Sequence, residues 1–353
     1  MIKVIEALYK EPRFQVEIEG VSSEWKEQKA GIRQGCPLSP YLFIIYMTVM
    51  FSDVKMEVRG LGLKYRVTGA NFDEVLFADD TICISTNTRA MNRMLSAIER
   101  IGKRSGMRLN KAKCEALQFN QQGKIVFQDK TPVRSVEESK YLGCVLRRDN
   151  NIIKEVRGRI REAATVLRKM HVFWRHSNCT VRFKLIVLNA ILYAKVLYGL
   201  ESAELPITAT KALDVFQLKC LRKILKMTTT FITRSNTNEE VFKRANSHLK
   251  QGEKIIPLSE IYQKRKTKLF YKVVQSEPQD PIRSIAFQSD SMKPRIFTPR
   301  RVGRPKAKWT KSECERAWKS IQDTTGQQTP YQEGSEIQGA AIRRFVQEQA
   351  NKK

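Results

Sequence analysis

The first third of the chain mixes the hydrophobic periods of strands and helices. Residues 14–19 alternate apolar and polar side chains up to Gly20, which predicts one arm of a hairpin that follows a helix over residues 2–9. Pro40 suits the first turn of a helix that runs to about Arg59, because the N–H that proline lacks has no helical partner in that turn. We expect the apolar stripe of this helix to pack inward; it consists of Leu42, Ile45 and Val49.

Short apolar runs bounded by turn-forming residues predict strands further along. These runs are residues 63–67, 75–78, 81–85, 115–119 and 141–146. The second and third runs flank Asp79 and Asp80, so they predict a tight hairpin with both aspartates at its turn. Thr88 is the expected N-cap of a helix that closes near Gly102 or Gly106.

The rest of the chain follows the helical period. Helices are predicted over residues 153–174, 181–198, 208–225, 313–321 and, marginally, 340–350. We therefore expect an α+β fold, in which an antiparallel sheet with packed helices precedes an all-helical region and a loose, basic C-terminal part. The predicted domains are residues 1–146, a helical region 147–227, a helical connector 228–293, and a basic linker and tail 294–353.

Charge narrows the choice of partner. The 353 residues include 64 Lys and Arg against 36 Asp and Glu, a formal charge of +28 that is spread along the chain. Such a field favours polyanions, and nucleic acid is the leading partner because cations that neutralise phosphates release counterions. Basic ribosome-associated and membrane-surface proteins share the same bulk charge.

The cysteine pattern and the hydropathy of the chain indicate its compartment and whether it spans a membrane. The seven cysteines are odd in number, widely spaced and without a CxxC pair, which predicts reduced thiols in an intracellular compartment, nuclear or cytoplasmic. The apolar stretches at residues 41–51 and 186–200 are too short, or too interrupted by Asn189 and Lys195, to span a bilayer. No membrane partner is expected.

Two segments carry candidate chemistry. Adjacent aspartates at a hairpin tip suit Mg²⁺, which prefers carboxylate oxygens, and they would support a two-metal clamp in phosphoryl transfer. Asp-Asp is also a common turn dipeptide. In the run from Gly31 to Pro40, Gly31 and Gly35 permit close approach of the backbone to a nucleotide. Gln34 offers an amide to a base and Arg33 a cation to phosphate. The alternative interpretation of this run is a turn that leads into a helix, and the Asp-Asp hairpin that follows favours the nucleotide contact over it.

Both segments, in this order, resemble a known family. Gly31-Ile32-Arg33-Gln34-Gly35-Cys36-Pro37-Leu38-Ser39-Pro40 and Leu76-Phe77-Ala78-Asp79-Asp80 are similar to two palm motifs of reverse transcriptases of non-LTR (LINE-type) retrotransposons. Weaker matches follow at residues 106–115 and 141–146. The resemblance covers residues 1–146 well and extends more loosely to Leu225. It implies a partial polymerase palm followed by a thumb-like helical region.

The resemblance also implies an activity and a set of site residues. The activity is RNA-directed DNA polymerase, with Mg²⁺ in a two-metal site and with an RNA template, a DNA primer and deoxynucleotide triphosphates as partners. The implied metal ligands are Asp79 and Asp80. Lys113 corresponds to a lysine near the triphosphate, although an ordinary surface lysine is the simpler interpretation. The implied nucleotide or template contacts are Arg33, Gln34, Gly35, Pro37 and Ser39, and the implied primer contacts are Leu142 and Gly143.

One expected ligand has no counterpart. The family's first palm strand carries another metal-binding aspartate, and residues 1–30 contain no segment that resembles it; nor do Asp53, Asp73 or Glu74 stand in one. We therefore expect an incomplete metal site and weak or no DNA synthesis by this chain, so its status as an enzyme stays open. The alternatives are a noncatalytic RNA- or DNA-binding remnant, and a fragment without an independent role. The sequence does not fix the oligomeric state.

Two basic regions remain. The helices near residues 194–201 and 216–225 resemble the family's thumb, and their basic faces either track a duplex backbone or are solvated surfaces. Residues 300–309 contain a Gly-Arg-Pro core similar to AT-hook peptides, with Val302 in place of an arginine; a linker that contacts phosphates without sequence preference is the alternative. The residues expected to bind nucleic acid here are Arg300, Arg301, Arg304 and Lys306.

Overall fold

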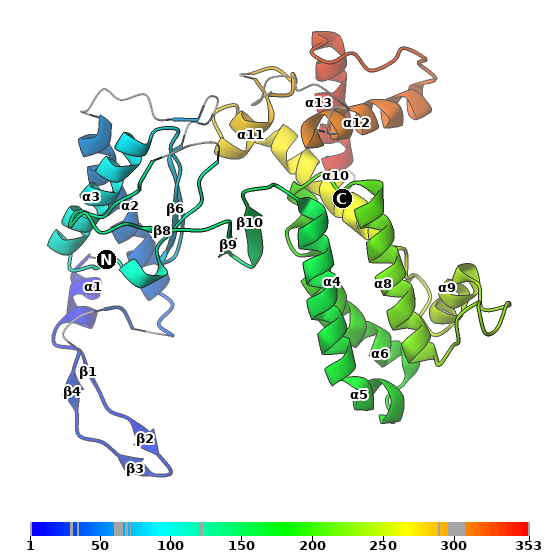
Figure 1. The fold of residues 1–353 in the computed structure, drawn as a ribbon, viewed down its shortest axis with the longest axis horizontal. Helices are drawn as coiled ribbons and strands as arrows, with labels where there is room; N and C mark the ends of the chain where they lie inside the picture. Colours follow the sequence, from blue (N-terminus) through cyan, green and yellow to red (C-terminus); the bar gives the residue numbers. More distant parts are fainter. Residues whose placement is uncertain are drawn as a thin grey trace. The chain divides into compact units, whose positions relative to one another are not determined.

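The chain forms two compact units (Figure 1). The structure is a computed structural model that describes residues 2–28, 31–33, 35–59, 66–67, 70, 72–119, 123–288, 290–295 and 308–351. Unit 1 consists of Met1–Tyr65, Glu74–Ala112 and Ile125–Pro132, and unit 2 of Arg66–Asp73, Lys113–Lys124 and Val133–Lys353. Helices and small, mostly antiparallel sheets make up the described part, so the expected α+β class is confirmed. The four-domain division of the sequence stays a prediction.

Unit 1 contains the elements predicted for the first part of the chain. They are α1 (Ile2–Tyr9), β1 (Arg13–Phe14), β2 (Glu17–Ile18), β3 (Val21–Ser22), β4 (Lys26–Glu27), α2 (Ser39–Arg59), β5 (Glu74–Phe77), β6 (Asp80–Cys83) and α3 (Thr88–Arg104). Antiparallel pairing of β2 with β3 and of β1 with β4 confirms the predicted hairpin. The N-cap of α3 is Asn87 rather than Thr88, because the Asn87 side chain accepts from the N–H groups of Arg89 and Ala90.

The buried face of α2 is not the predicted one. Ile45 and Val49 are 60% and 58% exposed, and the core that α2 builds against α3 uses another set of side chains. From α2 these are Met47, Met50, Phe51, Val54 and Val58. The helix is apolar on two faces, so its periodicity could not choose between them, and packing against α3 made the choice.

The strands after α3 also differ from the prediction. The run from Tyr141 to Leu146 is a hairpin instead of one strand: β9 (Glu138–Tyr141) and β10 (Cys144–Arg147) pair across a turn at Leu142 and Gly143. A parallel pair, β7 (Glu115–Ala116) with β8 (Arg134–Ser135), lies between α3 and this hairpin in the sequence. Of the strand expected at residues 63–67, only residues 66–67 are described, and they are not in a strand.

Unit 2 is largely helical, as predicted. Its helices are α4 (Ile152–Lys169), α5 (His171–His176), α6 (Val181–Leu188), the π-helical turn η2 (Asn189–Tyr193), α7 (Ala194–Leu197), the 3-10 helix η3 (Leu200–Ser202), α8 (Ile207–Leu225), α9 (Asn238–Ser247), α10 (Leu258–Gln275), α11 (Pro281–Ala286), α12 (Trp309–Thr325) and α13 (Glu336–Asn351). The 3-10 helix η1, which begins at Lys111 and ends at Lys113, starts in unit 1 and ends in unit 2. The last two helices are longer than the sequence predicted.

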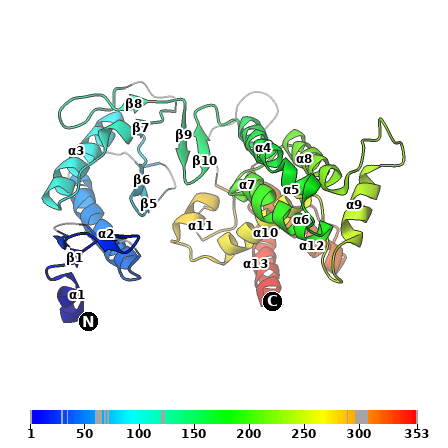
Figure 2. The ribbon, with the colours of Figure 1, turned by 90° about the horizontal axis from the view of Figure 1, so that it is seen from below.

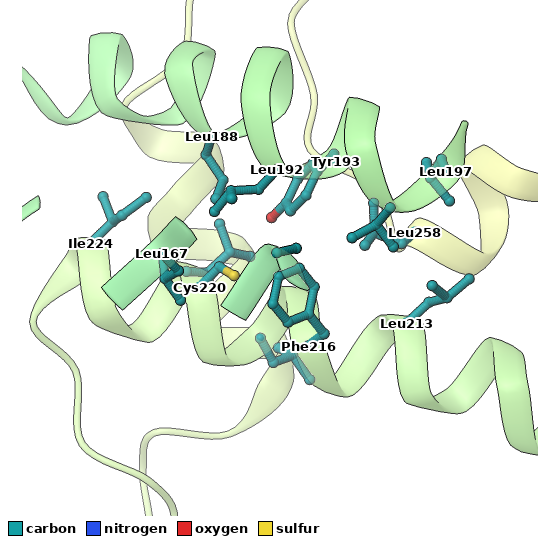
Figure 3. Close-up of a cluster of buried hydrophobic side chains, with 14 of the residues drawn as sticks. Leu167, Leu188, Leu192, Tyr193, Leu197, Leu213, Phe216, Cys220, Ile224 and Leu258 are labelled. Carbon is teal, nitrogen blue, oxygen red and sulfur yellow. The ribbon is translucent and has the colours of Figure 1, made fainter. Parts of the chain in front are cut away.

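The larger core of unit 2 lies among α4 to α10 (Figure 3). Leu188, Leu192 and Leu197 point into it from the stretch Val181–Ser202, which is the one stretch of the described helices with the length and apolar character of a membrane span. Because these side chains fill the core against α8, the stretch behaves as a core helix of unit 2. All seven cysteines are free, as expected, and Cys220 is among the buried ones.

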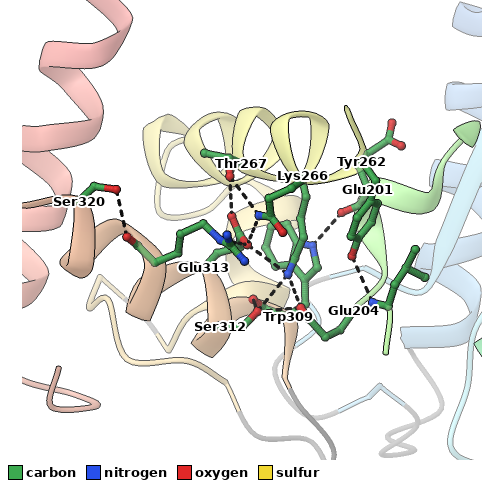
Figure 4. Close-up of polar contacts among 12 residues, drawn as sticks. Glu201, Glu204, Tyr262, Lys266, Thr267, Trp309, Ser312, Glu313 and Ser320 are labelled. Atoms are coloured by element: carbon green, nitrogen blue, oxygen red, sulfur yellow. Dashed lines mark hydrogen bonds and ion pairs between the residues drawn. The ribbon is translucent and has the colours of Figure 1, made fainter. Parts of the chain in front are cut away.

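Helix α10 joins two cores. Its first half packs on α8, and its second half packs with α11, α12 and α13 around a second apolar cluster that includes Phe270 and Trp318 (Figure 2). Between the two clusters the Lys266 side chain is fully buried and pairs with Glu204 and with Glu313, the latter at 3.1 Å (Figure 4). The two apolar clusters therefore meet at a polar cluster, which we call the Lys266 cluster.

Candidate functional site

The carboxylate pair Asp79 and Asp80 lies where the sequence placed it. Ala78 and Asp79 form the turn between β5 and β6, and Asp80 opens β6 opposite Phe77. Both aspartates are exposed, whereas Leu76 packs against the core of unit 1. The hairpin is thus anchored by its apolar side and presents two carboxylates to solvent.

The turn itself is strained. Ala78 has φ +51°, a left-handed conformation that costs a residue with a Cβ about 1–2 kcal/mol. Such conformations persist where the surroundings over-determine them, and they cluster at functional sites. The backbone therefore fixes where the carboxylate pair emerges from the hairpin.

The run from Gly31 to Pro40 is tied to α1. Arg33 donates a hydrogen bond of 2.6 Å to the carbonyl oxygen of Leu8, and its guanidinium lies 5.6 Å from the centre of the Tyr9 ring. The Tyr9 hydroxyl lies 3.0 Å from that of Ser39, which is 2% exposed at the start of α2. Arg33 and Ser39 thus hold α1 against the beginning of α2, while Gly35 and Pro37 are exposed. Gln34 lies outside the described residues.

Cys36 differs chemically from the buried cysteines Cys220 and Cys314. Hydrogen bonds from the backbone of Leu38, and then from Ser39, together with the nearby Arg33 charge, lower the pKa of the Cys36 thiol. Burial raises the pKa of Cys220 and of Cys314 to about 12. A larger thiolate fraction near neutral pH follows for Cys36.

We expect Cys36 to be alkylated before the buried thiols of Cys220 and Cys314. At pH 7 iodoacetamide should label Cys36 at least about tenfold faster than the buried thiols, because the thiolate is the reacting species. Peptide mass spectrometry over a time course measures the rates, and Ser39→Ala should slow the labelling of Cys36 by removing one donor. Labelling of Cys220 at the same rate as Cys36 in the folded chain would contradict this prediction.

The two lysines of η1 differ in their contacts. Lys113 is exposed and belongs to unit 2, whereas the carboxylate pair belongs to unit 1. Lys111 pairs with Asp129 at 2.6 Å and with Glu99 at 3.0 Å, and these hydrogen bonds raise the pKa of its ammonium. Lys111 is therefore engaged within unit 1, and the role of Lys113 at a triphosphate stays a prediction.

The expected primer contacts form the tip of the β9–β10 hairpin. Leu142 and Gly143 both have positive φ, +47° and +81°, which is the pattern of a type I′ turn. A Cβ on Gly143 would lie 3.4 Å from the Tyr198 ring, and one on Gly199 would lie 2.9 Å from the Cys144 sulfur. The hairpin tip thus packs closely on the residues that follow α7, so its position depends on the helices of unit 2.

A basic groove of about 690 Å³ lies between α4 and α8. It has an apolar floor that includes Ile160 and Phe216, and no acidic side chain lines it. Its cations, which define what we call the α4–α8 groove, are Arg147, Lys154, Arg157, Arg161, Lys211 and Lys219.

Only part of this charge is neutralised. Asp149 pairs with Lys154 at 2.7 Å and with Arg147 at 3.4 Å, and the bond from Lys154 lowers the pKa of Asp149. Within the described ranges the other four cations have no acidic partner. The sequence predicted basic faces at residues 194–201 and 216–225, and of the cations in these two ranges only Lys219 lines the groove. The i, i+4 spacing of Arg157 and Arg161 was the signal that it missed.

The carboxylate pair fits Mg²⁺ by the chemistry of its donors. This ion is usually held by one or two carboxylates and completes its shell with water and substrate phosphates. Among the residues that the structure describes, no group of three or more His, Cys, Asp or Glu side chains comes together. The expectation that a third carboxylate is missing stays a prediction.

The basic segment with Arg300, Arg301, Arg304 and Lys306 lies outside the described residues.

Comparison with known proteins finds similarity in the first part of the chain. Residues 2–146 match the family described as "Reverse transcriptase (RNA-dependent DNA polymerase)". The "RNA-directed DNA polymerase from mobile element jockey" of Drosophila funebris is 24% identical over 64% of this chain, which covers 25% of that relative. The jockey protein of Drosophila melanogaster is also 24% identical, over 63% of this chain and 24% of the relative.

A third relative belongs to another element. The "Retrovirus-related Pol polyprotein from type-1 retrotransposable element R2" of Nasonia vitripennis is 26% identical over 39% of this chain and 14% of the relative. The chain spans a quarter or less of the length of these curated relatives. The matched region contains the carboxylate pair and most of the β9–β10 hairpin, but it ends before the α4–α8 groove.

Proposed function

Since residues 2–146 match the reverse transcriptase family, we propose that this chain supplies part of an RNA-directed DNA polymerase of the non-LTR type. The partners would be an RNA template, a DNA primer and deoxynucleotide triphosphates. The observation that carries the proposal is the carboxylate pair at the strained tip of the β5–β6 hairpin, within the matched region. We also propose that the protein acts inside the cell, in the nucleus or the cytoplasm.

In this function the β5–β6 hairpin would position the negative charges of Asp79 and Asp80. Leu76 anchors the strands in the unit 1 core, and the φ of Ala78 fixes the turn, so the backbone from which the two carboxylates project is held in place. When bound, Mg²⁺ would neutralise the oxygens of the transferring phosphoryl group. Asp79 and Asp80 would hold the ion and orient the triphosphate, and the β9–β10 tip would support the primer end. Lys113 would neutralise the leaving pyrophosphate.

Primer extension tests the proposal. On an RNA template with Mg²⁺ we expect weak DNA synthesis at most, and we expect the Asp79→Asn, Asp80→Asn double variant to lose whatever synthesis the parent shows. Binding of Mn²⁺ in the presence of a deoxynucleotide triphosphate, followed by electron paramagnetic resonance, provides a second measurement. The double variant should bind the ion at least about tenfold more weakly, because two of its ligands lose their charge.

Asp53→Asn is the matched control, since Asp53 is exposed on α2 and should leave both measurements unchanged. Synthesis or Mn²⁺ binding that survives in the double variant would show that the carboxylate pair is not the metal site.

A second candidate function is supported by the α4–α8 groove. Its unpaired cations suit phosphates whether or not the chain carries out synthesis. A noncatalytic RNA- or DNA-binding protein would therefore show a salt-dependent affinity that is the same in the parent and in the Asp79→Asn, Asp80→Asn variant. That result, together with the absence of any extension, would favour this second function.

A further inference from the structure

The loop between α8 and α9, residues 228–236, presents two large apolar side chains to solvent. Phe231 is 98% exposed, more than any other large apolar residue in the described part of the chain, and Ile232 beside it is 73% exposed. The loop projects from the ends of the two helices (Figure 2). The pair makes no contribution to the core of unit 2.

The loop is held in one shape although its tip is bare. The Thr228 and Thr233 hydroxyls are hydrogen-bonded at 2.8 Å, and the Asn236 amide donates to the Thr228 hydroxyl at 2.8 Å. Asn236 is 7% exposed, and its carbonyl oxygen accepts from Arg222 of α8 at 3.2 Å. These bonds order the loop in the free protein. A ligand that contacts Phe231 would therefore not have to offset the loss of conformational entropy that ordering the loop would cost on binding.

The charged residues near the loop in the sequence indicate which class of ligand it would bind. Between Asp214 and Glu239 every charged residue is basic, which gives the loop and the end of α8 a run of cations. These are Lys219, Arg222, Lys223, Lys226 and Arg234. A bare aromatic ring among cations matches single-stranded nucleic acid, in which each phosphate is followed by a base whose face can stack. A membrane surface would need a larger apolar face than two side chains provide.

We propose that Phe231 stacks on an unpaired base of a nucleic-acid strand, with Lys226 and Arg234 near its phosphates. Any base has a face for stacking, so the contact would not depend on sequence. The proposal rests on nucleic acid as the partner in the proposed function, and it does not depend on catalysis or on the carboxylate pair.

Fluorescence anisotropy with a labelled single-stranded oligonucleotide and an abasic strand of equal length tests the stack. Phe231→Ala in the full chain should weaken binding to the base-containing strand by about tenfold and leave binding to the abasic strand unchanged. Phe231→Trp should keep the affinity, and the fluorescence that it adds to the parent signal should be quenched on the base-containing strand. Ile337→Ala, which truncates an 84% exposed side chain on α13, is the matched control and should change nothing.

Three results with the Phe231→Ala variant would overturn the proposal. Phe231→Ala could bind both strands as the parent does, or it could lose affinity equally for both, which would show that the bases are not contacted. It could also lose binding to phosphatidylserine vesicles while it retains the oligonucleotide, which would make the loop a membrane contact. Binding of neither strand by the parent would defeat this proposal and the proposed function together, whereas stacking without primer extension would count only against catalysis.

Discussion

Replacing Lys266 with methionine should lower the free energy of unfolding of unit 2 by about 3–5 kcal/mol. The Lys266 side chain has no exposed area and Glu313 is 1% exposed, so the loss of the ammonium leaves this buried carboxylate with the half-exposed Arg316, at 3.3 Å, as its remaining counter-charge. The Ser312 hydroxyl, which accepts from Lys266 at 3.0 Å, also loses a partner. Equilibrium urea unfolding, followed by tryptophan fluorescence, measures the change, since Trp309 donates to the carbonyl oxygen of Glu201 beside this cluster (Figure 4).

A lysine two residues away provides the control. Lys264 lies on the same helix and pairs with Glu260 in solvent, where such a pair contributes little, so Lys264→Met should cost less than about 0.5 kcal/mol. The double variant Lys266→Met, Glu313→Gln should recover part of the loss, because it also removes the buried negative charge that Lys266 had neutralised. Equal free energies of unfolding for Lys266→Met and Lys264→Met would show that the Lys266 cluster does not hold α10 to α12.

Removing charge from the α4–α8 groove is expected to have the largest effect on binding. Arg157→Gln with Arg161→Gln should weaken the binding of an RNA–DNA duplex by more than about tenfold at low salt. It should also reduce the slope of log affinity against log salt by about two, because each cation that contacts a phosphate contributes about one to the slope. Anisotropy titrations over a series of salt concentrations give both quantities.

The matched control for the groove also lies on α4. Arg168→Gln with Lys169→Gln removes the same charge from exposed positions at the end of the helix, outside the groove. This variant should lose less affinity than the groove variant. The two double variants could lose the same affinity and show the same reduction in the slope of log affinity against log salt. In that case the net charge of the chain, and not the α4–α8 groove, governs binding.

Local patterns predicted most elements correctly, and their failures share a cause. The β5–β6 hairpin follows from two apolar runs around Asp79 and Asp80, and α4 to α8 follow from helical periodicity. The inward face of α2 was wrong because Ile45 and Met47 are equally acceptable in a core, and only the approach of α3 distinguishes them. The turn at Leu142 was missed because leucine seldom has positive φ.

Residue order and composition alone indicate the resemblance of residues 1–146 to reverse transcriptases, the elements that carry its motifs and a strongly basic character. The tertiary structure decided which groups meet. It joined Arg33 to Leu8, placed the β9–β10 tip against Tyr198, gathered six cations between α4 and α8, and left Phe231 bare. Such contacts join residues far apart in the chain, and a local pattern carries no information about them because burial and pairing are settled only when helices and strands pack together.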